Sequence, residues 1–467
     1  MLRAPIYLRL CIIIVLFAYG ESVCWGKNTS DQAQKANPQQ ENNKIPDFVQ
    51  RRSTIPDLML KNKKPGRNWV LFPIIGHNPD DGTILGLSVR WVTNRTKDSP
   101  LFRYAPYKSS LRLGAAYGTG EMGKFLMEYD LPYWRDTRWR LRSRLSVSRT
   151  NGENYFGVGE ETLSDLRYPG SPSTFNRFKD YEDALNQNVN GRTYANYNNY
   201  RLDLKRLDLS FERASWGGVL LPFFGLEVAH YDIFDYTGSK KDGAVNQRTR
   251  LLTDHEAGRI LGFDGGWDNA LKLGLAYDTR DFQPNPTRGV FLQGMGRFPF
   301  QALGARFTYQ QYKLEGRGYY DFLKSNQQAL VLALRAAMVT QQGDVPFYAM
   351  NIIPETDGDW RGLGGANTMR GYANNRFVGE HATWANVELR WWFKDVTLWK
   401  HHLMFGIAPF LDSGRVYDSL DQFALEDWRS TYGVGFRLAW NVATVINFDF
   451  GWSAEADSFY MKLGSQY

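Results

Sequence analysis

Cysteine is almost absent from this sequence. The two cysteines, Cys11 and Cys24, both lie near the N-terminus, so the body of the chain has no internal disulfide. After the N-terminal stretch no apolar run reaches the roughly 18 residues that a membrane-spanning helix needs, and the mean hydropathy is −0.46. These absences exclude a disulfide-stapled scaffold and a helical membrane protein. Strands remain as the elements with which this chain can cross a membrane.

The sequence also lacks the common signatures of hydrolytic and metal chemistry. It has no G-x-S-x-G motif, and no spacing among its six histidines forms a triad or a metal site; they are His77, His230, His255, His381, His401 and His402. We therefore predict no catalytic residue, no metal and no cofactor, with a barrel lipase or protease as the less favoured alternative. The net charge of +7 comes from scattered basic residues and does not predict binding to nucleic acid.

The N-terminus has the pattern of a secretory signal. Arginines precede the apolar stretch Leu10 to Ala18, which is followed by small residues suited to cleavage. We expect residues 1–20 to be a signal peptide; an uncleaved anchor and lipidation of Cys24 are the alternatives. Residues 21–67 are polar and rich in Gln, Asn and Lys, which predicts a periplasmic tether and not a folded domain.

From residue 69 onward, apolar and polar residues alternate with the period of two that is typical of β-strands. In the stretch 139–147, for example, Arg140, Arg142 and Arg144 share one face and apolar residues occupy the other. Three neighbouring arginines in a dry core would be very costly, so one face suits lipid and the other suits water or ion pairs. We predict an all-β fold, a transmembrane antiparallel β-barrel over residues 68–467. A soluble antiparallel sheet with one wet face is the alternative.

The alternating segments predict about sixteen strands. They are 70–77, 83–92, 108–117, 123–131, 138–148, 200–211, 217–231, 270–277, 289–297, 307–322, 329–339, 382–393, 403–416, 431–440, 444–451 and 458–467. If connections from odd to even strands face outward, the long segments 151–199, 232–269 and 341–381 all lie on one side, as in outer-membrane barrels. The last residue, Tyr467, resembles the C-terminal aromatic signal by which such barrels are recognised for assembly.

Several short motifs lie in the second half of the chain. They are a turn motif with Asp278, Arg280, Asp281, Pro286 and Gly289; the triplet Arg370, Gly371 and Tyr372 in a turn-rich segment; Glu388 on the next strand; and Phe410, Asp412 and Gly414 on the strand after that. With these motifs the chain resembles the BamA/TamA-like family of outer-membrane barrels, also called the bacterial surface antigen family. The resemblance covers most of residues 69–467.

The resemblance implies that the sixth extracellular loop folds back into the barrel lumen, where Arg370 meets Glu388 and Asp412. The strand patterns agree, because both carboxylates lie on polar faces and one guanidinium can pair with two carboxylates. Tyr372 is expected to pack beside Phe410. The alternative is that this cluster only locks the loop and takes no part in transport.

The resemblance also implies a role in moving material across or into the outer membrane. Larger members of the family receive clients through periplasmic POTRA domains, and the segment before Trp69 is too short for one, so no client is predicted. We expect a monomer in the cell outer membrane, in contact with lipid and with the barrel assembly machinery during its biogenesis, that inserts or translocates protein or lipid. A passive pore or structural barrel is the alternative.

Overall fold

The computed structural model describes residues 45–60, 63–78, 82–323, 325, 328–356, 358–398, 401–424, 426–440 and 444–463. All of them belong to one compact unit, Lys44–Tyr467. The predicted signal peptide, the first part of the predicted tether and the C-terminal Tyr467 lie outside the described residues.

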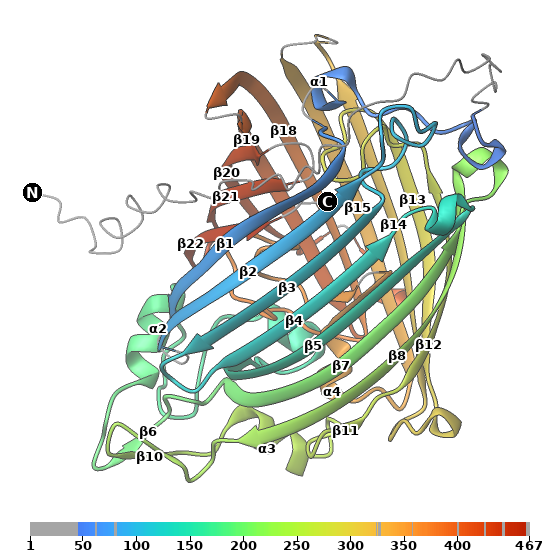
Figure 1. Ribbon diagram of the computed structural model, residues 1–467. Coiled ribbons are helices and arrows are strands. Elements are labelled where there is room, and N and C mark those ends of the chain that lie inside the picture. Colours follow the sequence, from blue (N-terminus) through green and yellow to red (C-terminus); the bar gives the residue numbers. More distant parts are fainter. Residues whose placement is uncertain are drawn as a thin grey trace, which may run out of the picture. The chain divides into compact units, whose positions relative to one another are not determined.

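Sixteen long antiparallel strands follow one another in a meander (Figure 1). They are β1 (Gly66–Asn78), β2 (Gly82–Asn94), β3 (Ser109–Gly118), β4 (Gly123–Leu131), β5 (Trp139–Asn154), β7 (Asn199–Arg213), β8 (Leu220–Asp235), β12 (Ala270–Asp278), β13 (Gly289–Pro299), β14 (Tyr309–Asp321), β15 (Ala329–Gly343), β18 (His381–Leu398), β19 (His401–Tyr417), β20 (Arg429–Trp440), β21 (Thr444–Trp452) and β22 (Asp457–Leu463). A two-residue strand, β11 (Gly266–Trp267), also pairs with β8. The predicted number of strands is confirmed.

The two faces of each strand differ as the alternation predicts. On β5, Trp139, Leu145 and Val147 are exposed on the outer face of the sheet. The arginines between them point to the inner face, where Arg140 contacts Asp130 at 2.6 Å and Arg142 contacts Glu212 at 3.2 Å. Pairing with carboxylates on neighbouring strands makes the inner face tolerable for charge, while the apolar outer face suits lipid.

One long connection shows that the sheet is rolled into a barrel. Residues 344–380, which we call the lumen loop, join β15 to β18. Tyr348 of this loop stacks on Tyr231 of β8 with ring centroids 4.4 Å apart. Further along the loop, the Asn367 side chain accepts a hydrogen bond from Lys462 of β22 at 2.6 Å. Because one loop touches strands from distant parts of the meander, it lies inside the barrel that those strands form, as the fold prediction states.

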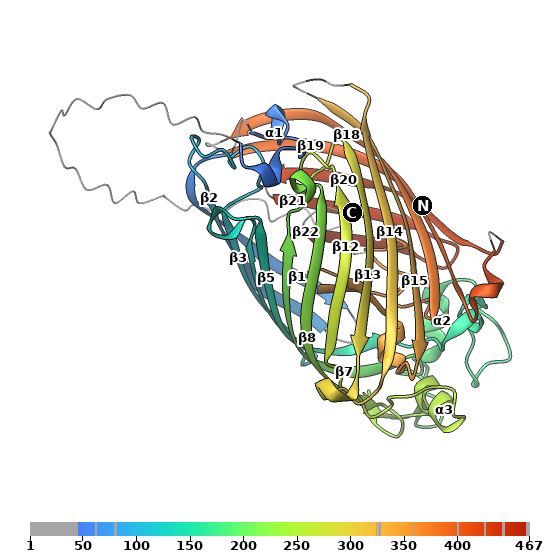
Figure 2. The same cartoon turned by 90° about the vertical axis from the view of Figure 1, so that its right-hand side faces the viewer.

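The two ends of the barrel differ in their connections. The predicted long segments all connect strands at the same end of the barrel, near α2 and α3 in Figures 1 and 2. In the structure they are residues 155–198, residues 236–269 and the lumen loop. The opposite end carries mainly short turns, such as 132–138 and 214–219. We call these the long-loop end and the short-turn end. The arrangement confirms the predicted sidedness.

The strand between the short turn 214–219 and the long segment 236–269 begins later than predicted. The sequence analysis starts it at Gly217, but β8 begins at Leu220 because residues Trp216–Gly218 form a short 3-10 turn. Gly217 and Gly218 have φ angles of 69° and 94°, values that extended strands do not adopt. The sequence analysis included these turn residues in the alternating segment and so placed the start of the strand too early.

Several elements are not part of the barrel wall. They are the helices α1 (Asp57–Leu60), α2 (Phe178–Leu185), α3 (Arg250–Glu256) and α4 (Phe347–Met350), with the short strands β6 (Arg192–Thr193), β9 (Lys240–Lys241), β10 (Ala244–Asn246), β16 (Ile352–Glu355) and β17 (Gly358–Arg361). None of these is predicted from the sequence. In the described part of the chain, no helix has the length and apolar character needed to cross a membrane.

The N-terminal part of the described chain also packs on the barrel. Residues 45–60 and 63–65, which we call the strap, lie over the short-turn end, where Figure 1 shows them in blue with α1 at the top. The Arg51 amide donates to Gly217 O at 3.0 Å, and the Ile55 amide donates to Arg103 O at 2.8 Å. The sequence analysis places these residues in the predicted tether. In the structure they are held against these two turns and, through Ser53, against Thr279 in a third.

Candidate functional site: an arginine-locked loop inside the barrel

Arg370 of the lumen loop lies against the inner wall of β18 and β19. Its guanidinium forms a bidentate contact with Asp412, with Nε to Oδ2 at 2.8 Å and Nη2 to Oδ1 at 2.7 Å. Nη1 donates to Glu388 Oε1 at 2.5 Å, and the Arg370 amide also donates to Asp412, at 3.1 Å. All three side chains are fully buried. The structure therefore brings together the arginine and the two carboxylates singled out from the sequence.

Further charges surround this cluster. Arg390 donates to Glu388 at 2.7 Å, and Arg437 contacts both Glu388, at 3.0 Å, and Asp449. Asp449 also lies 3.5 Å from Arg370. Three arginines thus face three carboxylates, and the balance of charge makes so many buried ions acceptable. Sequence reasoning did not single out the members from β20 and β21, although Arg437 and Asp449 both alternate with apolar residues on their strands.

Glycines allow the lumen loop to approach the wall closely. Gly371 has a φ angle of 118°, and a Cβ there would lie 3.0 Å from the carbonyl carbon of Trp452. On the facing strand a Cβ at Gly451 would lie 2.7 Å from the backbone of Arg370. Gly414 plays a similar part, because a Cβ there would lie 3.0 Å from the sulfur of Met369. The backbone of the motif is therefore fitted to the wall as closely as its side chains.

Tyr372 has a different neighbour from the one expected. It is buried and packs edge-on against Phe377 of the same loop, with ring centroids 4.9 Å apart. Phe410 instead lies under the guanidinium of Arg370, whose central carbon is 3.4 Å from the ring centroid. A flat cation over an aromatic face is attracted by the ring's quadrupole, which explains an aromatic residue two positions before Asp412.

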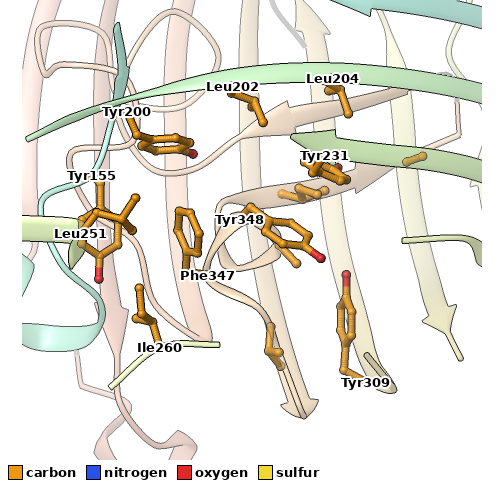
Figure 3. Close-up of a cluster of buried hydrophobic side chains, with 14 residues drawn as sticks. Tyr155, Tyr200, Leu202, Leu204, Tyr231, Leu251, Ile260, Tyr309, Phe347 and Tyr348 are labelled. Atoms are coloured by element: carbon orange, nitrogen blue, oxygen red, sulfur yellow. The ribbon is translucent and has the colours of Figure 1, made fainter. Parts of the chain in front are cut away.

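A second anchor holds the first part of the lumen loop. Figure 3 shows Phe347 and Tyr348 inside a cluster of buried apolar side chains from the barrel wall and the long loops. Phe347 packs edge-on against Tyr155 and Tyr200, at centroid distances of 5.6 and 5.4 Å. Phe347 and Tyr348 belong to none of the motifs in the sequence, and the sequence analysis did not find this anchor.

An ion-pair network lies beside this second anchor. Lys313 of β14 contacts Glu355 of the loop at 2.5 Å and Glu315 of its own strand at 3.0 Å. Glu315 also binds Arg335 of β15 at 2.6 Å, and Arg335 donates to the carbonyl of Asn367 at 2.9 Å. The network therefore joins the early and the late part of the loop to the same two strands.

We expect Lys313→Met to loosen the first part of the lumen loop. The substitution removes the ammonium that contacts the buried Glu355 carboxylate, and breaking a buried ion pair costs about 3–5 kcal/mol. Hydrogen exchange in residues 347–355 is predicted to accelerate while exchange in β14 stays slow. Leu314→Ala on the lipid-facing side of the same strand is the control. Equal protection of residues 347–355 in both variants would contradict the expectation.

The turn motif between β12 and β13 lies at the short-turn end. Asp278 is fully buried and binds Arg280 through Nε at 2.9 Å and Nη2 at 3.1 Å. It also accepts from Gln283 at 3.0 Å and contacts Arg52 of the strap at 3.3 Å. Asp278 is thus the point where this turn and the strap meet.

The rest of the turn motif shapes the turn itself. Asp281 accepts hydrogen bonds from the amide and the hydroxyl of Thr287, at 2.9 and 2.5 Å. Burial raises the pKa of Asp281 above its ordinary value, against these hydrogen bonds, which lower it. Gly289 has a φ angle of 103°, and a Cβ there would lie 2.5 Å from Thr279 O. Pro286 lies in the turn between these residues.

The described residues contain no group of three or more histidine, cysteine, aspartate or glutamate side chains placed to hold a metal ion. The carboxylates of Glu388, Asp412 and Asp449 are paired with arginines, as the distances above show. The arrangement can hold a loop in a defined position, and it can release that loop if the arginine contacts break.

Fold and site together define an outer-membrane β-barrel whose lumen contains a loop fastened to its wall. A family model for the Omp85 superfamily domain matches residues 109–467, and the chain belongs to the Omp85 superfamily. This superfamily comprises barrels for protein insertion and secretion at the outer membrane. A second model, a domain of unknown function, matches residues 46–108, which include the strap, β1 and β2.

Similar proteins include barrels from several bacteria. Outer membrane protein assembly factor BamA from Nitratidesulfovibrio vulgaris is 24% identical over 174 residues, which cover 35% of this chain and 20% of that protein. Among solved structures, BamA from Haemophilus ducreyi lacking POTRA domains 1–3 has a TM-score of 0.47 and 13% identity, covering 86% of this chain and 70% of that chain. CdiB from Escherichia coli has a TM-score of 0.47 and 11% identity, covering 86% and 62%. The match to the curated relative thus spans a fifth of its length.

Proposed function

We propose that this protein inserts or translocates proteins at the outer membrane and that the Arg370 cluster holds the lumen loop in its working position. The observation that carries the proposal is the Omp85 superfamily match over residues 109–467. The buried contacts of Arg370 with Asp412 and Glu388 support it, because they hold the loop to a wall that also includes the last strands. Under this proposal the protein has no catalytic activity and requires no cofactor.

The proposed partners follow from the same function. The apolar outer face contacts outer-membrane lipid, the barrel assembly machinery is the partner during biogenesis, and the barrel works as a monomer. The clients are outer-membrane or secreted proteins. Residues 1–20 as a signal peptide and Tyr467 as an assembly signal belong to this proposal.

Depletion of the protein from its host tests the proposed function. Outer membranes are isolated at intervals after depletion, and their proteins and lipids are quantified by mass spectrometry. We expect a defined set of outer-membrane or secreted proteins to decline, to return with the wild-type gene and to return only partly with Arg370→Ala. Unchanged protein composition with reduced uptake of small solutes would contradict the proposal and favour a passive pore. A change confined to lipids would contradict the assignment to proteins.

A further inference from the structure

The strap is bound to the barrel partly through backbone hydrogen bonds, although it contains a short 3-10 turn at Asp47–Val49 and the helix α1. Its backbone donates to Gly217 O through Arg51 and to Arg103 O through Ile55. The Arg52 guanidinium donates to Gly218 O at 3.1 Å. These acceptors are backbone carbonyls of two turns at the short-turn end, so much of the recognition does not depend on the side chains of the barrel.

The wall beneath the strap is shaped to receive a backbone. A Cβ at Gly218 would lie 2.3 Å from the carbonyl oxygen of Phe48, and one at Gly217 would lie 2.6 Å from the Arg51 side chain. Beside this turn, Phe48 packs on Tyr133 with ring centroids 5.4 Å apart. Any residue larger than glycine would fill the space in which the strap lies. We call this space, between the turn at Gly217 and Gly218 and the turn after Asp278, the strap groove.

Two side chains of the strap fit defined positions. Arg52 contacts the buried carboxylate of Asp278 at 3.3 Å. Three residues later, Ile55 is 1% exposed and packs in an apolar cluster at the short-turn end of the lumen. The other members of that cluster are Phe282, Tyr319, Ala329, Val331, Ala333, Trp392, Met404, Ala439 and Val445. Ile55 therefore lies among side chains from the turn after Asp278 and from six strands, which places the strap across the opening of the lumen.

The groove remains electrostatically satisfied without the strap. If Arg52 leaves, Asp278 keeps its bidentate contact with Arg280 and its hydrogen bond from Gln283. Removing one partner from a buried ion pair is costly when the remaining charge has no other partner. Asp278 still has Arg280 after Arg52 leaves, so the loss of Arg52 costs less. The strap is thus held firmly enough to dock, by contacts that a competing segment can replace.

We propose that the strap groove is a binding site for a polypeptide segment carrying an arginine followed three residues later by an aliphatic residue, and that the strap is its internal occupant. A client segment with this pattern displaces the strap and enters the lumen from the periplasm. The inference rests on the proposed function for the identity of the client, since the short-turn end faces the periplasm in this superfamily's orientation. The groove itself is defined by the contacts above.

Peptide binding to the full-length protein tests this proposal. The probe is a fluorescent synthetic peptide with the sequence of residues 46–60, and the control peptide has serine at the positions of Arg52 and Ile55. The proteins are the wild type and the loosened variant Arg52→Ala/Ile55→Asp, both in detergent. We expect the probe to bind the loosened variant at least 10-fold more tightly than the wild type, and the control peptide to bind neither.

Two further variants separate the groove from nonspecific binding. Gly218→Ala and Asp278→Asn, each in the loosened background, are expected to reduce probe binding at least 10-fold, the first by filling the groove and the second by removing the charge. The proposal is overturned if the wild type and the loosened variant bind the probe equally, or if neither binds it. Specific probe binding together with unchanged outer-membrane proteins after depletion would leave the groove in place and reject the proposed client.

Discussion

Arg370→Ala is expected to release the second part of the lumen loop and to lower the stability of the folded barrel. The substitution leaves the Asp412 carboxylate buried without its arginine, while the Asn386 side chain still donates to it at 2.8 Å. Breaking such a buried pair costs about 3–5 kcal/mol. The measurement is proteolysis of residues 363–380 in the folded protein, together with the temperature at which the barrel unfolds in detergent. Faster cleavage and a lower unfolding temperature are the expected results.

A double-mutant cycle separates the ion pair from general damage. Asp412→Asn and the double variant Arg370→Met/Asp412→Asn complete the cycle with Arg370→Met. Because the double variant leaves no charge unpaired between these two positions, we expect it to be less destabilised than the sum of the single variants, by about 1–3 kcal/mol. Strictly additive effects would show that the contact between the two residues does not stabilise the loop. Arg370→Lys should recover only part of the loss, since an ammonium lacks the planar fork.

Gly371→Ala is expected to detach the loop although it changes no charge. The φ angle of 118° strains any residue with a Cβ, and the added carbon would lie 3.0 and 3.1 Å from backbone atoms of Trp452 and Ser453. The strain alone costs about 1–3 kcal/mol, and the backbone contact comes in addition. Hydrogen exchange of the Gly371 region and the unfolding temperature measure the effect.

Gly318→Ala on β14 is the matched control for this glycine. A Cβ at Gly318 has no heavy atom within 4 Å, so the same chemical change should leave the unfolding temperature within about a degree or raise it slightly. Equal loss of stability in both variants would show that the effect comes from replacing glycine in general, and not from the close approach of the loop to β21 and the turn that follows it.

The barrel could be predicted from the sequence because its physical cause is repeated along the chain. Each strand must present lipid-compatible side chains on one face and charged or polar ones on the other, as Arg140 and Arg142 do beside Trp139. The resemblance in the last two hundred residues also pointed to Arg370, Glu388 and Asp412, which the structure brings into contact.

The remaining parts of the site depend on tertiary contacts that leave little local signal. Phe347 and Tyr348 occupy a short apolar helix that is anchored by distant residues such as Tyr200 and Tyr231 of the wall. The strap carries apolar side chains such as Phe48 and Ile55, but it belongs to a longer segment, residues 21–67, that is polar on average. It is ordered by turns that lie more than a hundred residues away, such as the one at Gly217. Composition alone predicts a tether there, since it does not report backbone hydrogen bonds to distant carbonyls.

Single-channel conductance in a planar bilayer is the most direct test of a lumen closed by its own chain. The proteins are the wild type, the loosened strap variant Arg52→Ala/Ile55→Asp, and that variant combined with Arg370→Ala. The account predicts small, intermittent currents for the wild type, a modest increase when the strap is loosened, and large stable currents when the lumen loop is released as well. Large steady currents from the wild type that neither set of substitutions changes would contradict it and identify the barrel as a passive pore.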